Sequence, residues 1–322
     1  MIEIIEHKGY GHPDTICDTV VEKCSKFLDE YYQTLYNKVL HYNVDKALFL
    51  AGDMNISYNY IDIIKPPSFI LGGQISKLDY RLKHELEYLI RYEINNILPN
   101  INNKFYVEIR SNNVSNNLND ISMNESGIIY ANDTSFCVAH YPYTESEVLV
   151  LNIKNEIKTI ISNNLFPIGE DFKIMKSTDY VYISTPVYYN KVNGFNEYLD
   201  VLNKFKIHLE TIFTSVKFKI NPDSDNGFPY LTACGSSIEC GDDGQVGRGN
   251  RFNGLITPMM PMTMEAYSGK NNKNHTGKIY QQLAFDEAKR LYVESSNPCK
   301  VTLISKIGKD INDYDIVVET YY

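Results

Sequence analysis

Residues 241–254, GDDGQVGRGNRFNG, combine glycine with side chains that could bind phosphate or a metal ion. The segment holds five glycines, two aspartates and two arginines in fourteen residues. Glycine lets a backbone approach a ligand closely, and the carboxylate of Asp242 or Asp243 can reach a cation. The guanidinium groups of Arg248 and Arg251 can clamp phosphate oxygens. The alternative is a turn-rich surface connection without a ligand.

The spacing in this segment matches neither of the two common phosphate-binding loops. A Walker loop needs Lys and then Ser or Thr after its last glycine, but Leu255 and Ile256 follow Gly254. A dinucleotide-binding turn needs a third glycine at a position that Phe252 occupies. A polar loop with a less common mode of ligand binding is therefore expected.

A second segment, GYGHPD at residues 9–14, places two glycines, a histidine and a carboxylate at the expected start of a helix. The free N–H groups and the dipole at a helix N-terminus favour an anion. His12 can donate to a phosphate, and Asp14, which shares a helix face with Asp18, could hold Mg²⁺ beside it. Taken alone, this segment is explained more simply as a capped surface helix with a histidine in its turn.

Two further segments offer charged side chains in turns. Residues 264–278 place Lys270 after a Ser-Gly pair and Lys278 at the start of a predicted helix. Residues 131–136, ANDTSF, place Asp133 in a short turn before an apolar strand. The simpler alternatives are a solvated basic loop and an ordinary turn aspartate.

Composition narrows the class of protein. A net charge of −9 argues against a broad nucleic-acid-binding surface, which needs a basic excess. No apolar run approaches the roughly 18 residues of a membrane span, and no basic-then-apolar leader opens the chain. We therefore expect a cytoplasmic protein that binds neither membrane nor nucleic acid. The six cysteines form no CxxC pair, which favours reduced, partly buried thiols over structural zinc.

Hydrophobic periodicity predicts the elements that must position these side chains. Helices are expected over 14–36, 77–97, 144–164, 195–213 and 278–294. Strands are expected over 38–52, 61–72, 135–141, 179–189, 215–221, 230–238, 300–308 and 315–322. Pro66-Pro67 interrupts the strand expected over 61–72. Residues 107–127 are expected to begin as a strand and become a loop. Many neighbouring strands are close enough to pair antiparallel, which favours an α+β fold with several small sheets.

Four blocks, taken in order, resemble the S-adenosylmethionine synthetase (methionine adenosyltransferase) family in its archaeal-type branch. They are HKGYGHPDTICD, ANDTSF, GDDGQVGRGNRFNGLITP and MTMEAYSGKNNKNHTGKIY. The resemblance runs from about residue 4 to the end, and the last two blocks are highly specific. It implies one compact unit, residues 1–322, of three α+β subdomains about a pseudo-threefold axis, interleaved in sequence. The approximate subdomains are 9–105 with 238–278, 1–8 with 141–237, and 106–140 with 279–322.

The resemblance implies transfer of the adenosyl group of ATP to the sulfur of methionine, and cleavage of the tripolyphosphate to phosphate and diphosphate. It also implies Mg²⁺, K⁺ in many members, and a homodimer whose active sites form between subunits. A thioether sulfur is a neutral nucleophile that needs no base, so catalysis depends on alignment and on neutralising the leaving group. This chemistry agrees with the lack of a Ser-His-Asp or Cys-His signature.

Site residues can be carried over from the family by position. The resemblance implies catalytic His12, Arg248 and Lys270, substrate-binding Asp133, Asp62, Asn113, His275, Lys278 and Arg251, and metal ligands Asp14, Asp242 and Asp243. It gives His12 a contact with the triphosphate as the bond breaks, and Asp133 a contact with the amino acid. Thr15 stands where the bacterial and eukaryotic branch has a lysine.

Two segments depart from the family pattern. Residues 59–62 replace a Gly-Gly-Gly-Glu turn, and residues 110–115 replace an Arg-Ile-Gly-Gln-Gly-Ser loop. Both belong to the amino-acid side of the site in the family. A paralogue that adenosylates another small nucleophile or mainly hydrolyses the triphosphate therefore stays open, as does a non-catalytic nucleotide-binding partner subunit. The chain also ends short of the family's C-terminal helix, so a trimmed third subdomain is expected.

Overall fold

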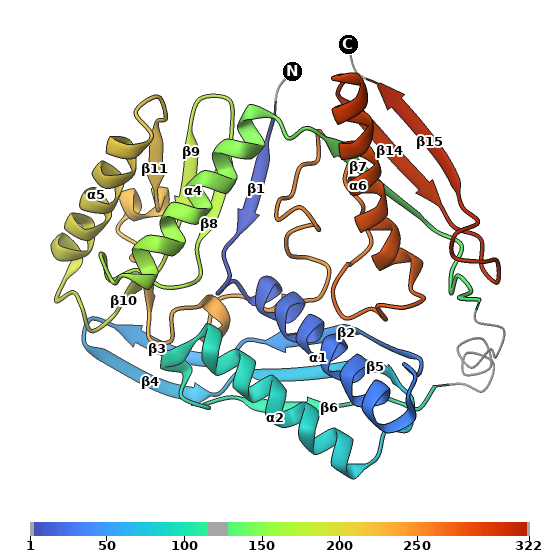
Figure 1. The fold of residues 1–322 in the computed structure, drawn as a ribbon. Coiled ribbons are helices and arrows are strands. Elements are labelled where there is room, and N and C mark those ends of the chain that lie inside the picture. Colours follow the sequence, from blue (N-terminus) through green and yellow to red (C-terminus); the bar gives the residue numbers. More distant parts are fainter. Residues whose placement is uncertain (1–2, 115–127, 321–322) are drawn as a thin grey trace.

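Three larger sheets, each packed against helices, surround a middle region that the segment between β13 and α6 crosses (Figure 1). The structure is a computed structural model that describes residues 3–114 and 128–320. Each sheet has its own hydrophobic core. The α+β fold with several small sheets, predicted from the spacing of strands, is confirmed. The subdomain boundaries stay a prediction.

Two helices pack on the first sheet. Its strand order is β13-β2-β5-β6, where β2 is Tyr42–Leu50, β5 is Ser68–Ile75, β6 is Tyr106–Ile109 and β13 is Gly244–Gln245. Helix α1, Pro13–Tyr36, packs on β2 and β13, and α2, Tyr80–Ile97, packs on β6. A hairpin of β3, Asp53–Ser57, and β4, Tyr60–Lys65, extends from this unit.

The second sheet begins with the strand that leads into α1. Its order is β1-β8-β9-β11, where β1 is Ile5–Lys8, β8 is Lys173–Lys176, β9 is Val181–Ser184 and β11 is Phe218–Ile220. Helix α4, Glu145–Ser162, packs on β1 and β8, and α5, Phe195–Ile212, packs on β11. A short parallel pair of β10, Val187–Tyr188, and β12, Leu231–Thr232, lies beside it.

The third sheet has the order β15-β14-β7, with β7 at Phe136–Tyr141, β14 at Cys299–Ile304 and β15 at Asp315–Thr320. Helix α6, Thr276–Ser295, packs on β7 and β14. Short 3₁₀ turns, η1 at Pro99–Ile101, η2 at Pro222–Asn226 and η3 at Ser237–Glu239, complete the described elements. No helix among the described residues is long and apolar enough to cross a membrane.

Two strand predictions are wrong in their extent. The strand expected over 179–189 is divided into β9 and β10, because Pro186 has no N–H group to continue a ladder. The strand expected over 230–238 ends after Thr232, since Gly235 adopts a φ of +96° and the chain turns into η3. Residues 115–127 of the loop expected after β6 are not among the residues that the structure describes.

Candidate active site

The start of helix α1 is built around His12, whose side chain caps the helix. Its Nδ1 accepts a hydrogen bond from the N–H of Asp14 at 3.2 Å, and Pro13 occupies the first turn, where no N–H is needed. Gly11 lets the backbone of residue 170 approach, because a Cβ at Gly11 would lie 2.5 Å from the carbonyl carbon of Glu170. The glycines here thus allow two chain segments to pack, and they fix the position of the imidazole.

The glycine-rich segment lies along the first turns of α1. The N–H of Gln245 donates to Oδ1 of Asp14 at 2.8 Å, and the N–H of Gly247 donates to Oδ1 of Asp18 at 2.9 Å. A Cβ at Gly244 would lie 2.3 Å from the carbonyl oxygen of Pro13. Some glycines of this segment are therefore explained by packing, because the loop backbone lies directly against the start of α1.

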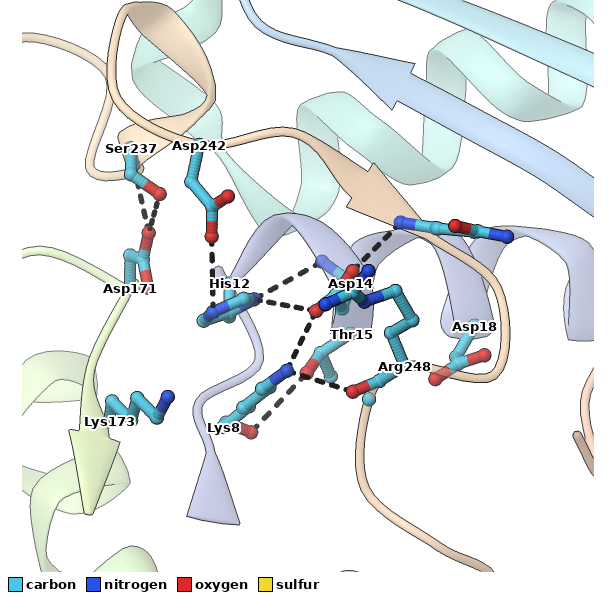
Figure 2. Close-up of polar contacts among 12 residues, drawn as sticks. Lys8, His12, Asp14, Thr15, Asp18, Asp171, Lys173, Ser237, Asp242 and Arg248 are labelled. Atoms are coloured by element: carbon cyan, nitrogen blue, oxygen red, sulfur yellow. Dashed lines mark hydrogen bonds and ion pairs between the residues drawn. The ribbon is translucent and has the colours of Figure 1, made fainter. Parts of the chain in front are cut away.

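The imidazole of His12 is buried and faces a carboxylate. Its Nε2 lies 3.7 Å from Oδ2 of Asp242, on the turn after η3 (Figure 2). Burial and the nearby charge of Lys8 lower the pKa of His12 to about 4, so the ring is neutral at pH 7. Because Nδ1 is a hydrogen-bond acceptor, the neutral ring carries its proton on Nε2. Partial burial and the charge of Asp14 raise the pKa of the Asp242 carboxyl.

A lysine that the sequence analysis missed completes this group. Lys8, the last residue of β1, donates from Nζ to Oδ2 of Asp14 at 2.8 Å and to the carbonyl oxygen of Arg248 at 2.8 Å. Lys173 on β8 is paired in register with Lys8, and its charge also acts to lower the pKa of His12. For Lys173 the sequence signal would have been the pairing of β1 with β8, which lie far apart along the chain, whereas Lys8 lies within the HKGYGHPDTICD block itself.

Asp171 was also missed, and it ties two parts of the site together. Its Oδ2 accepts hydrogen bonds from the N–H of Ser237 at 2.8 Å and from the Ser237 hydroxyl at 2.6 Å. Burial raises the pKa of Asp171 to about 6. These bonds connect the segment before β8, which contains Asp171, to the turn that carries Asp242 (Figure 2).

The two arginines of the glycine-rich segment have different environments. The guanidinium of Arg248 is exposed and makes no hydrogen bond or ion pair with any described residue. Arg251 instead donates to the carbonyl oxygens of Gly247, Gly249 and Met264. The expectation that both arginines clamp phosphate therefore fits Arg248, whereas the guanidinium of Arg251 braces its own loop.

The lysines of the 264–278 segment are buried against carboxylates. Lys270 Nζ pairs with Asp45 and lies 3.4 Å from Oε1 of Glu265. Lys278 Nζ lies 2.6 Å from Oε2 of Glu22. Both cations thus have acidic partners, and the sequence analysis did not identify them because two of the three, Asp45 and Glu22, are distant along the chain.

Lys278 and His275 are also shaped by their burial. The ammonium of Lys278 lies 5.0 Å from the centre of the Tyr267 ring, and burial lowers the pKa of Lys278 despite the charge of Glu22. His275 caps α6 by accepting from the N–H of Gly277, and burial lowers the pKa of His275 to about 3. His275 is therefore a neutral capping residue in this structure.

A cavity of about 230 Å³ connects the glycine-rich segment with the 264–278 segment. Its lining joins residues of α1, of both segments and of α6, and comprises Asp18, Gly247, Asn250, Arg251, Phe252, Glu265, Ala266, Tyr267, Ser268 and Gln281. Both segments identified from the sequence thus face one space.

Four predicted site residues make their described contacts elsewhere. Asp243 accepts from the N–H of Ala51 at 2.7 Å, and Asn113 accepts from the N–H of Leu78 at 3.1 Å. Asp133 is exposed and accepts from the N–H of Thr134 at 2.7 Å, and Asp62 is exposed on β4. Asp14, Asp242 and Asp243 do not converge, and within residues 3–114 and 128–320 no three His, Cys, Asp or Glu side chains form a metal-binding group.

Comparisons with known proteins match nearly the whole chain. The S-adenosylmethionine synthetase (AdoMet synthetase) family profile matches residues 1–320. The S-adenosylmethionine synthase of Methanococcus aeolicus is 36% identical over 347 residues, covering 98% of this chain and 84% of that protein. The synthase of Archaeoglobus fulgidus is 36% identical over 336 residues, covering 97% and 84%.

A solved structure is similar in fold. An unusual S-adenosylmethionine synthetase from Campylobacter jejuni superposes with a TM-score of 0.66 at 15% identity, covering 98% of this chain and 80% of that one. At this identity the likeness concerns the fold alone, while the sequence matches extend over nearly the whole chain. The chain therefore belongs to the S-adenosylmethionine synthetase family.

Proposed function

We propose that this chain makes S-adenosylmethionine from ATP and methionine at the group of side chains around His12. The reaction itself follows from membership of the family. The placement of the reaction is supported by one observation, a neutral imidazole at a helix N-terminus whose Nε2–H points toward the Asp242 side chain. Arg248, whose guanidinium has no partner among the described residues, lies in the same group (Figure 2).

The chemistry of the step explains what these residues must do. The lone pair of the methionine sulfur forms a bond to C5′ of ATP, and the C5′–O bond breaks with its electron pair leaving on the triphosphate. No proton moves in this step, so no general base is needed. The transition state instead gains charge on the leaving oxygens, where Nε2–H of His12 and the guanidinium of Arg248 can donate hydrogen bonds.

The family is metal-dependent, and we propose Mg²⁺ as the metal, with K⁺ as a second ion. Mg²⁺ typically takes one or two carboxylates and completes its shell with water and substrate phosphates. Asp14 and Asp242 fit this pattern, because their carboxylates flank His12 and the charge of Asp14 acts on Asp242. Bound there, Mg²⁺ would neutralise charge on the triphosphate. Asp243 is the weaker candidate, since its carboxylate caps Ala51.

For the amino-acid side we propose a homodimer in which the partner subunit completes the site. Asp62 lies on the exposed face of β4 between Tyr60 and Ile64, which are 56% and 57% exposed. Leu48 and Tyr106, on the sheet face opposite α1 and α2, are 40% and 61% exposed. Such apolar exposure suits an interface with a second copy. We propose that Asp62, Asn113 and Asp133 serve the amino-acid substrate there.

A mixing experiment tests whether sites are shared between subunits. The His12→Ala and Asp62→Ala variants should each be inactive alone. When they are mixed and allowed to exchange subunits, a heterodimer would contain one intact site, so activity should reappear at about a quarter of wild type. If the mixture stays inactive while subunit exchange is demonstrated, the shared site is refuted.

The assignment of the activity is tested with ATP, Mg²⁺, K⁺ and methionine, following S-adenosylmethionine and phosphate together. We expect both products, with tripolyphosphate cleaved to phosphate and diphosphate before release. Phosphate without S-adenosylmethionine would favour another nucleophile or simple hydrolysis. Bound ATP with neither product would favour a non-catalytic partner subunit.

A further inference from the structure

We propose that Lys8 is a phosphate-binding residue of this site, held against Asp14 in the free protein and contacting the triphosphate when substrate is bound. The inference rests on the proposed function, because it assigns a residue to the same reaction. It concerns a side chain on β1, outside the helix turn and the glycine-rich segment that provide the other candidates.

Two hydrogen bonds hold the ammonium of Lys8 in a largely buried position. Its side chain is only 11% exposed, and Nζ donates to Oδ2 of Asp14 and to the carbonyl oxygen of Arg248, each at 2.8 Å. These bonds place the charge between the helix start and the backbone of Arg248, on the side where His12 lies (Figure 2). A lysine ammonium has three donors, so one stays available for a ligand.

The paired strands concentrate positive charge at this point. Lys8 and Lys173 are register partners in the antiparallel β1–β8 ladder, so their side chains share one face of the sheet. Like charges directly opposite each other destabilise a sheet. Glu6 offsets part of the repulsion, with Oε1 at 3.1 Å from Lys173 and 3.9 Å from Lys8. A polyanion would relieve the remainder.

Asp14 keeps its position without help from Lys8. Its second oxygen, Oδ1, accepts from the N–H of Gln245 at 2.8 Å, and its own N–H is bonded to His12. The Lys8–Asp14 ion pair is therefore dispensable as an anchor for Asp14. If Asp14 binds a metal ion, the ammonium of Lys8 loses its close carboxylate partner and gains a phosphate oxygen in its place.

The test measures binding of tripolyphosphate by calorimetry in saturating Mg²⁺, the condition in which Asp14 can bind the metal ion. The Lys8→Met variant keeps the apolar stem and loses the charge, and we expect its affinity to fall about tenfold or more. Lys204→Met is the matched control, because Lys204 is an exposed lysine of α5 paired with Asp200. Its affinity should equal that of wild type.

A rescue variant separates charge from structure. Thr15 lies beside Lys8, with its hydroxyl donating to the Lys8 carbonyl oxygen at 3.3 Å. A lysine at residue 15 can therefore bring a charge to the same place from the first turn of α1. Both Lys8→Arg and the double variant Lys8→Met/Thr15→Lys should regain most of the lost affinity.

The possible outcomes discriminate between the hypotheses. An affinity of Lys8→Met within twofold of wild type would overturn the assignment. So would an equal loss in Lys8→Met, Lys8→Arg and the double variant, since structure and not charge would then be responsible. If wild-type protein makes S-adenosylmethionine and these results are negative, only the role of Lys8 fails. If wild type binds no tripolyphosphate at all, the proposed function fails.

Discussion

Nε2 of His12 lies 3.7 Å from Oδ2 of Asp242, and the opposite ring nitrogen is committed to the backbone of α1. The cap fixes the tautomer and the direction of the only N–H that the ring can offer. The distance to Asp242 is longer than a hydrogen bond, so this donor is still available to a ligand. Under the proposed function, this neutral donor and the carboxylate proposed to bind metal would face the same phosphate.

Replacing His12 by alanine should lower kcat by about 10²–10³-fold, the usual cost of one donor to a developing oxyanion. Steady-state formation of S-adenosylmethionine measures the change. Because burial and Lys8 lower the pKa of His12 to about 4, its titration should cause no inflection between pH 6 and 9 in the kcat/KM profile of wild type. An inflection near pH 6.5 that disappears in the variant would contradict the neutral imidazole.

Arg248→Ala should reduce turnover by about 10²-fold or more, with the fold intact, because the exposed guanidinium has no described partner to lose. Arg248→Lys should recover only part of the rate, since one ammonium cannot reproduce a bidentate contact. Turnover and melting temperature should be measured together. The control is Arg290→Ala on α6, whose guanidinium pairs with Glu287 and Glu294. A near-normal rate in Arg248→Ala would remove this arginine from the site.

What the sequence could predict was local in character. Helix α1, its start at Pro13 and the placement of His12 and Asp14 follow from residues within one or two turns of each other. The α+β class likewise follows from short strands near in sequence. The glycines of 241–254 were interpreted as room for a ligand, but Gly244 faces the backbone of Pro13, more than two hundred residues away. Local spacing contains no information on such a partner.

The charged partners of the lysines were invisible for the same reason. The sequence predicts a catalytic Lys270 and a substrate-binding Lys278, but it does not reveal that Lys270 pairs with Asp45 from β2 or that Lys278 pairs with Glu22 from α1. A buried cation needs a nearby carboxylate or must lose its charge. That rule predicts that partners exist, but only the tertiary fold identifies them.

Asp18→Asn should stabilise the protein at alkaline pH. Burial raises the pKa of Asp18 to about 7, against the opposing effects of the Gly247 N–H and Arg251. In the native state the Asp18 carboxyl therefore keeps its proton up to about pH 7, whereas in the unfolded state it loses it near pH 4. The free energy of unfolding therefore falls as pH rises from about 4 to about 7. Asparagine keeps the acceptor for Gly247 without the charge.

Urea denaturation of wild type and Asp18→Asn at pH 4.5 and pH 8.5 measures this effect. The free energy of unfolding of the variant should exceed that of wild type by roughly 1–3 kcal/mol at pH 8.5, and the two should nearly coincide at pH 4.5. A variant that is less stable than wild type at pH 8.5 would show that the Asp18 carboxylate is stabilised by its surroundings.

Glu147→Gln should destabilise the protein, and more at acidic than at alkaline pH. The Nε2 atom of His140 lies 3.0 Å from Oε2 of Glu147, and its Nδ1 lies 3.2 Å from the carbonyl oxygen of Pro261. Both ring nitrogens thus face acceptors, which favours the doubly protonated imidazole. Burial acts to lower the pKa of His140, but the hydrogen bond and charge of Glu147 outweigh it and raise the pKa.

A raised native pKa contributes stability below the unfolded value of 6.5, and that contribution is lost as pH rises through the native pKa. Breaking the buried pair at pH 6 should therefore cost about 3–5 kcal/mol of unfolding free energy, and clearly less at pH 9. Glu145→Gln on the exposed side of α4 is the control and should change little at either pH. An equal loss of unfolding free energy in Glu147→Gln at both pH values would contradict this prediction. Glu147 would then act only as a hydrogen-bond acceptor in the cap of α4, and the charge of the His140–Glu147 pair would not contribute to stability.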